Sequence, residues 1–158
     1  MMTYTRATER MRIANRYSIA VHILSLLGAL RDAEHTSDWM AGSIGVNPVV
    51  VRNVTGMLRR AGLVRTQQGV AGTRLARPLS QITLLDVYRA VEDGASVFSV
   101  HPRPNPECPV GSRIQETLNE VFASAERAMQ ANLAAVTVGQ LVRRLRSAPA
   151  RRFLSCTP

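Results

Sequence analysis

Arginine is the side chain on which most of the chemistry of this sequence depends. All 20 basic residues of the 158-residue chain are arginines, against 11 carboxylates, so the formal net charge is +9. The planar guanidinium group binds carboxylates, phosphates and guanine edges through paired hydrogen bonds, and it stays protonated at physiological pH. Because lysine is absent, the chain lacks the phosphate-binding loop of nucleotide hydrolases and any amine nucleophile, which excludes both kinds of enzyme.

The arginines are distributed unevenly along the chain. Residues 1–77 carry a net charge of +7, residues 78–142 carry −3 and residues 143–158 carry +5. Between Trp39 and Leu85 there are six arginines and no carboxylate. Such a stretch presents an uncompensated positive field to a polyanion. The alternative is a solvated basic face without a ligand, and the order of the structural elements must decide between the two.

The other reactive side chains give little indication of catalysis. Two cysteines, Cys108 and Cys156, cannot form a disulfide framework and are interpreted as thiols. The histidines at positions 22, 35 and 101 lack metal-ligand spacing, and no HExxH, GxSxG, GxGxxG or paired CxxC motif occurs. We therefore expect no enzyme activity. No membrane span or secretory signal is visible, so a cytoplasmic protein without membrane contact is expected.

The elements that position the arginines are predicted to be mainly α-helical. Apolar residues recur at spacings of three and four over residues 15–31, which predicts a largely buried first helix. A short second helix is expected over Asp38–Ile44, with Thr36 or Ser37 as its N-cap. Gly45 provides the left-handed residue that ends it. A third helix follows directly, and helix, glycine turn, helix is the arrangement of a helix-turn-helix.

The third helix is predicted to start at Asn47-Pro48 and to stop at Gly62. Its pattern divides it into two faces. The inward face comprises Val50, Val51, Val54, Met57, Leu58 and Ala61, and the outward face comprises Val49, Arg52, Asn53, Gly56, Arg59 and Arg60. The outward face is therefore basic and carries an amide.

A β-wing is expected after the third helix. The short runs Leu63–Gln67 and Thr73–Ala76 are compatible with strands, and Gly69 and Gly72 between them allow the positive φ of a hairpin. Arg77-Pro78 closes the wing because proline cannot continue the ladder. Thr83-Leu84-Leu85-Asp86 then predicts a capping box for a helix to about Glu92.

The second half of the chain has a different character. Four prolines within residues 101–110 predict a stiff loop. A long helix follows, with an apolar stripe formed by Ile114, Leu118, Val121, Ala125, Met129 and Leu133. A two-fold partner that supplies the same helix would cover this stripe, although the helix could instead fold back on its own domain. Thr137 is expected to cap a last short helix through Leu145.

These elements predict five segments. They are an N-terminal extension (1–14), a winged helix-turn-helix domain (15–93), a proline-rich linker and sensor loop (94–110), a dimerisation helix region (111–146) and a basic tail (147–158).

The order of the elements resembles the Rrf-two (Rrf2) family of winged-helix transcription regulators, which includes the bacterial iron–sulfur cluster regulator, the nitric-oxide sensor and the cysteine-metabolism regulator. The resemblance rests on Tyr17–Leu27, Asn47–Arg52, Ala61–Val64, Gly69–Gly72, Leu75–Pro78 and Ile82–Val87. It implies a homodimer that binds a near-palindromic promoter site on double-stranded DNA, usually as a repressor. The chain departs from the family in the wing, where Thr73 stands in place of a second common glycine.

The resemblance and the basic outward face together suggest which residues bind DNA. The third helix would enter the major groove, where Arg52 reads guanine or phosphate, Asn53 reads adenine and Val49 meets a thymine methyl. Arg59 and Arg60 would meet phosphate, and the wing would reach the minor groove. The full set of expected DNA-binding residues is Asn47, Val49, Arg52, Asn53, Arg59, Arg60, Gly69, Gly72 and Arg74.

Cys108 is the candidate sensor residue. Cluster-binding members of the family place three cysteines in the loop before the dimer helix, whereas this loop contains Cys108 alone. We therefore expect no iron–sulfur cluster and place the chain in a cluster-free branch. At the start of the long helix, Cys108 would be a thiolate that senses oxidants or electrophiles, or it would be an inert packed cysteine. A regulator that responds to a small-molecule ligand, or a winged-helix protein-interaction module, is the alternative function.

Overall fold

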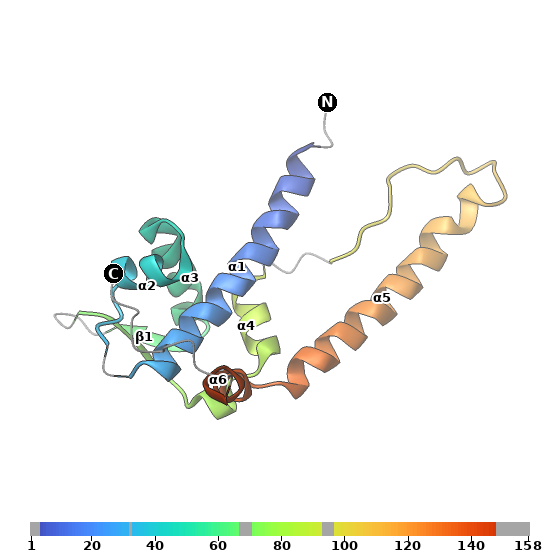
Figure 1. The fold of residues 1–158 in the computed structure, drawn as a ribbon. Coiled ribbons are helices and arrows are strands. Elements are labelled where there is room, and N and C mark those ends of the chain that lie inside the picture. The colour runs from blue at the N-terminus through green and yellow to red at the C-terminus, as the bar shows by residue number, and fades with distance from the viewer. Residues whose placement is uncertain (1–3, 32, 67–70, 93–96, 148–158) are drawn as a thin grey trace.

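The computed structural model describes residues 4–31, 33–66, 71–92 and 97–147. These residues are mainly helical with one two-stranded antiparallel sheet, as predicted, and the order of the elements is that of a winged helix-turn-helix followed by a long helix (Figure 1). The elements are α1 (Tyr4–Ala29), α2 (Ser37–Ile44), α3 (Pro48–Arg60), β1 (Val64–Thr66), β2 (Thr73–Leu75), η1 (Leu79–Gln81), α4 (Leu84–Val91), α5 (Gly111–Ala135) and α6 (Val138–Ser147).

Local interactions start α2 and α4, and end α2, where the sequence predicts. The Thr36 hydroxyl accepts from the Trp39 amide at 3.2 Å and begins α2. The Thr83 hydroxyl accepts from the Asp86 amide, and the Asp86 carboxylate accepts from the Thr83 amide, so the capping box of α4 is complete. Gly45 ends α2 in the left-handed conformation, with φ of 76°.

The first helix begins earlier than predicted. The apolar spacing predicts a start at residue 15, but α1 begins at Tyr4. Residues 4–14 contain no glycine or proline, and seven of the eleven are arginine, alanine, methionine or glutamate, which favour helix without any apolar stripe. A prediction based on burial periodicity therefore missed these turns.

The core of the winged part includes the last helix. Ile23, Leu24, Val54 and Leu58 are fully or almost fully buried, and Val138 from α6 is buried among the same group of side chains. Two backbone hydrogen bonds fix the approach of α6, from the Leu84 amide to the Val136 carbonyl at 2.8 Å and from the Val138 amide to the Ile82 carbonyl at 2.9 Å. Although the sequence groups α6 with the dimerisation region, its packing joins it to the winged domain.

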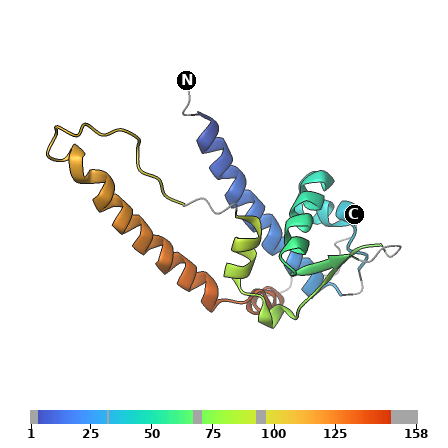
Figure 2. The same cartoon turned by 180° about the vertical axis from the view of Figure 1, so that it is seen from behind.

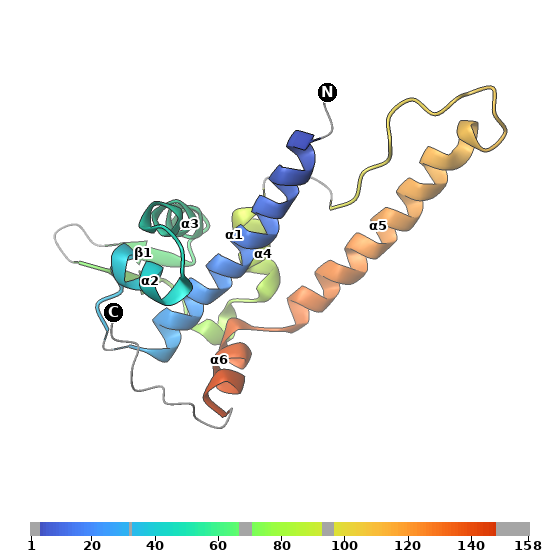
Figure 3. The ribbon, with the colours of Figure 1, turned by 45° about the horizontal axis from the view of Figure 1, so that its top comes forward.

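Helix α5 projects from this body. Figures 2 and 3 show it leading away from α6 on one side, with the proline-rich loop returning along it. None of its side chains is buried, and Val121 in the middle of its apolar stripe is 57% exposed. Phe98 from the loop stacks on Phe122, with ring centroids 5.0 Å apart. The stripe is therefore only partly covered in a single chain: Ile114, Leu118, Met129 and Leu133 are half-buried, and Val121 and Ala125 are exposed.

Candidate nucleic-acid interface

The outward face of α3 is exposed as the sequence predicts. Arg52, Asn53 and Arg60 are exposed, and Val49 is 51% exposed. The opposite side of the helix is anchored by Val51, Val54, Thr55 and Leu58, all of which are buried. Because the buried side chains fix the rotation of the helix, the exposed set is presented on one side.

The N-terminus of α3 is ordered by its own cap. The Asn47 side-chain oxygen accepts from the Val49 amide at 2.8 Å, and Pro48 occupies the first turn. Asn47 thus has a structural role at the helix end that comes closest to Val49 and Arg52. No carboxylate lies in the first turn, so the positive end of the helix dipole stays unneutralised.

The two arginines at the far end of α3 differ in their surroundings. Arg59 Nη1 donates to the hydroxyl of Thr66 on β1 at 3.2 Å, which ties the helix to the wing. The Arg60 side chain extends back along the helix, so that a Cβ at Gly56 would lie 3.8 Å from its Nη1. Arg60 therefore shares the exposed face with Arg52, whereas Arg59 links two elements.

The wing carries its arginines on the side that faces away from α3. Arg65 pairs with Arg74 across the two strands, while Val64 is buried and Thr66 contacts Arg59. Neighbouring strand residues point to opposite faces, so Arg65 and Arg74 lie on the other face of the hairpin. The structure does not bring Arg74 together with the exposed residues of α3.

The base of the wing is held against the connection between α1 and α2. The Thr73 amide donates to the His35 carbonyl at 3.0 Å. Gly72 has φ of 94°, and a Cβ there would lie 3.3 Å from the His35 amide nitrogen, so the close approach requires glycine. Gly69, the other predicted wing residue, lies outside the described residues.

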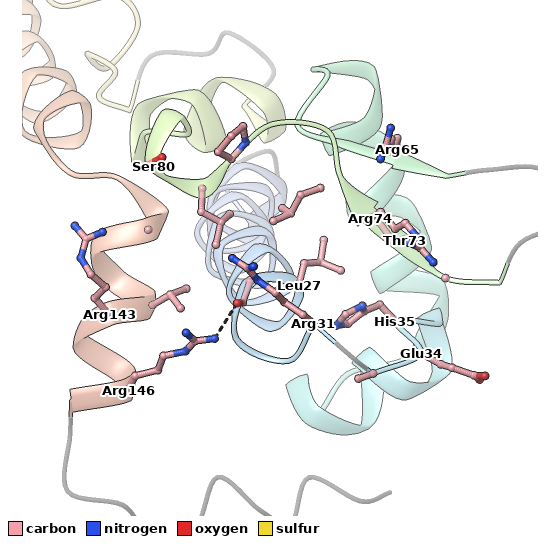
Figure 4. A pocket seen from close by; sticks show the side chains of 18 of the residues that line it. Leu27, Arg31, Glu34, His35, Arg65, Thr73, Arg74, Ser80, Arg143 and Arg146 are labelled. Atoms are coloured by element: carbon pink, nitrogen blue, oxygen red, sulfur yellow. Dashed lines mark hydrogen bonds between the residues drawn. The ribbon is translucent and has the colours of Figure 1, made fainter.

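A cleft of about 940 Å³ opens on this second face of the hairpin. We call it the arginine cleft, because five arginines line it, and Figure 4 shows that they come from several elements around it. They are Arg31, Arg65, Arg74, Arg143 and Arg146. Sequence reasoning selected only Arg74 among them. The spacing of Arg143 and Arg146 on one helix was a usable signal, but their proximity to Arg31 depends on tertiary packing.

Cys108 lies just before α5 on the proline-rich loop. Its amide donates to the Asn105 carbonyl at 3.3 Å, and its carbonyl accepts from the Ser112 amide at 2.9 Å. The pKa of the thiol is lowered from its ordinary value, because the backbone amides of Gly111 and Val110 stabilise the thiolate. Close approach of the loop needs Gly111, since a Cβ there would collide with the Asn105 carbonyl.

Comparison with known proteins agrees with these features. The model of the Rrf2 family, described as an iron-dependent transcriptional regulator, matches residues 13–144. The chain belongs to the Rrf2 family. It is 41% identical over 133 residues to YwnA of Bacillus subtilis (strain 168), which is named as an HTH-type transcriptional regulator, and the match covers 84% of this chain and 98% of YwnA.

Solved structures of Rrf2-like fold lead to the same assignment. A crystal structure described as a DNA-binding protein is 38% identical, with a TM-score of 0.66, and the match covers 80% of this chain and 97% of that one. A transcriptional regulator from Lactobacillus plantarum is 28% identical, with a TM-score of 0.71 and coverage of 84% and 90%. The predicted family and fold are confirmed.

Two further properties of this Rrf2 chain follow from the described residues. None of the helices that the structure describes is both long and apolar enough to cross a membrane. Within the same ranges, no three histidine, cysteine or carboxylate side chains come together as a metal site would require.

Proposed function

We propose that this chain is a homodimeric repressor that binds a near-palindromic promoter site through α3. The observation that carries the proposal is the exposed face of α3, on which Val49, Arg52 and Asn53 are neighbours beside a capped helix N-terminus. Inserted in the major groove, Arg52 pairs with a guanine edge, Asn53 pairs with adenine and Val49 meets a thymine methyl. The relatives named as transcriptional regulators support this use of the fold.

Selection of bound duplexes from a random pool tests the proposal. We expect an enriched sequence with two inverted half-sites whose centres are about one or two helical turns apart. Arg52→Ala should relax the preference at one base pair of each half-site, while Arg60→Ala should weaken binding to all sequences alike. Affinity should also fall steeply with salt, because each neutralised phosphate releases a counterion. A flat salt response, or enrichment of no sequence, contradicts the proposal.

The dimer is supported by the incompletely buried stripe of α5. None of the 25 residues of this helix is buried, although Ile114, Leu118 and Leu133 are apolar and face one side. A second copy of the same helix buries the stripe and relates the two α3 helices by a two-fold axis. In sedimentation experiments Val121→Asp should give a monomer, whereas Ala123→Asp on the opposite side should leave the dimer intact. A monomeric parent chain would refute this part.

Redox control through Cys108 is the regulatory part of the proposal. A thiol whose pKa is lowered by the amides of Gly111 and Val110 reacts as thiolate with peroxide, which transfers one oxygen to the sulfur and leaves as water. The resulting sulfenic acid changes the loop that joins the winged domain to α5. Peroxide should weaken operator binding in gel shifts of a Cys156→Ser variant, and Cys108→Ser should remove the response.

An iron–sulfur cluster does not fit the residues that the structure describes. Such clusters are held mainly by thiolates, and Cys108 is the one free cysteine within these residues. His101 has no second thiolate beside it on this loop. We therefore propose that the chain acts without a cluster, and we derive no step through iron.

A further inference from the structure

The arginine cleft is separate from the face of α3 that the proposed function uses. Its floor is the end of α1, one wall is the hairpin face that carries Arg65 and Arg74, and the other wall is α6 with η1 (Figure 4). Among its lining residues, five arginines face a single carboxylate, Glu34. The lining therefore has a formal charge of +4, because Glu34 balances only one of the five arginines.

Most of this charge has no partner within the described chain. Arg146 donates to the carbonyls of Gly28 and Ala29, at 3.1 and 3.0 Å, and so caps the end of α1. The guanidinium groups of the other four arginines make no hydrogen bond or ion pair to any residue that the structure describes; these are Arg31, Arg65, Arg74 and Arg143. Four unpaired guanidinium groups around one cleft repel each other, and bound anionic groups would relieve that repulsion.

A buried histidine with an unpartnered ring nitrogen lies in the lining of the cleft. His35 lines the cleft and is only 7% exposed, and its imidazole lies by the backbone carbonyls of Leu30 and Leu26. Among the described residues its Nε2 atom has no hydrogen-bond partner. Buried polar atoms are nearly always satisfied, by protein, water or ligand. The imidazole also lies edge-on to Trp39, with ring centroids 5.6 Å apart, so a change at His35 is reported by the one tryptophan of the chain.

We propose that the arginine cleft binds a small organic acid that carries two or more anionic groups. Arginines on opposite walls can each pair with one carboxylate or phosphate group, bidentately. Leu27, Pro78, Leu79 and Val142 provide apolar surface for the carbon skeleton between these groups. The volume of about 940 Å³ is within the range of small-molecule sites. A small acid fits better than a duplex, because the cleft opens on the hairpin face that points away from α3.

Bound acid would join the wing to α6. Arg65 and Arg74 belong to the hairpin, and Arg143 belongs to a helix that packs on α1, so one ligand spans both parts. The position of the wing relative to α3 then depends on the ligand. This coupling rests on the proposed DNA-binding function, whereas the binding itself does not.

Tryptophan fluorescence of the full chain without DNA tests the binding. Citrate, inorganic pyrophosphate and AMP are titrated at constant ionic strength, with chloride as reference. We expect at least one of the three to change the Trp39 emission saturably and to raise the melting temperature. The Arg31→Gln/Arg143→Gln variant should raise the dissociation constant about tenfold or more. Both side chains are exposed, so the variant should fold normally.

Matched controls separate this site from general charge effects. Arg113→Gln/Arg127→Gln removes the same charge from α5 and should leave the affinity for the acid unchanged. If no acid shifts the signal more than chloride, or if both double variants weaken binding equally, the proposal is overturned. It is also overturned if the Arg31→Gln/Arg143→Gln variant loses affinity for duplex DNA but keeps its affinity for every acid. The proposed DNA contacts are tested separately by Arg52→Ala. Failure of acid binding can therefore be told apart from failure of DNA binding.

Discussion

Truncation of one side chain tests whether α6 is part of the winged domain. Val138 at the start of α6 is fully buried in the core formed with α1 and α3. Val138→Ala removes two buried carbon atoms, and at about 0.8 kcal/mol per methylene this costs about 1.6 kcal/mol. The cavity left behind adds to that loss, so the free energy of unfolding should fall by about 2 to 3 kcal/mol.

Urea denaturation followed by circular dichroism measures this loss. With a slope of about 2 kcal/mol per molar urea, the midpoint should fall by about 1 M. Leu145→Ala is the matched control, because it removes more carbon from the same helix but at a side chain that is 50% exposed. It should cost less than about 1 kcal/mol. Chain concentration is kept constant, since association shifts apparent stability.

Equal midpoints for the two variants would refute the packing argument. In that case α6 would contribute nothing to the winged core and would belong with the dimerisation region, as the sequence pattern alone suggests. A second result would have the same meaning, namely a chain ending at Ala135 that unfolds at the same urea concentration as the full chain.

Three further measurements follow from individual groups. Thr83→Ala removes the side-chain half of the α4 capping box and should cost about 1 kcal/mol in urea denaturation, with Thr117→Ala on exposed α5 as the control. Burial lowers the pKa of His35, so the unfolded chain takes up the proton first; stability should fall as the pH drops below about 6.5, and His35→Gln should flatten that slope between pH 7 and 5.5. In a Cys156→Ser background, the rate at which iodoacetamide alkylates Cys108 is measured against pH. The pH of half-maximal rate should lie below that of a free thiol, because the thiolate is stabilised. A value at or above that of a free thiol would contradict the stabilisation.

The outward face of α3 is the part of the candidate site that the sequence pattern predicts. Its exposed residues follow from a 3.6-residue period, and the buried valines confirm the same rotation. The wing was predicted as a hairpin, but the side on which Arg74 lies depends on the register of Arg65 opposite Arg74. With β1 held by the buried Val64, a shift of β2 by one residue would have turned Arg74 toward α3. The sequence pattern of two short strands does not specify that register.

The sequence by itself determined the features of this protein that depend on near neighbours. The helix starts at Asn47 and Thr83 and the turn at Gly45 rest on contacts within a few residues, so their chemistry is visible in the order of side chains. Tertiary structure decided the rest. Arg146 reaches the Gly28 carbonyl across 118 positions of the chain. That meeting, and the cleft beside it, exist because buried apolar faces of α1 and α6 pack together, which fixes where charged residues far apart in sequence come to lie.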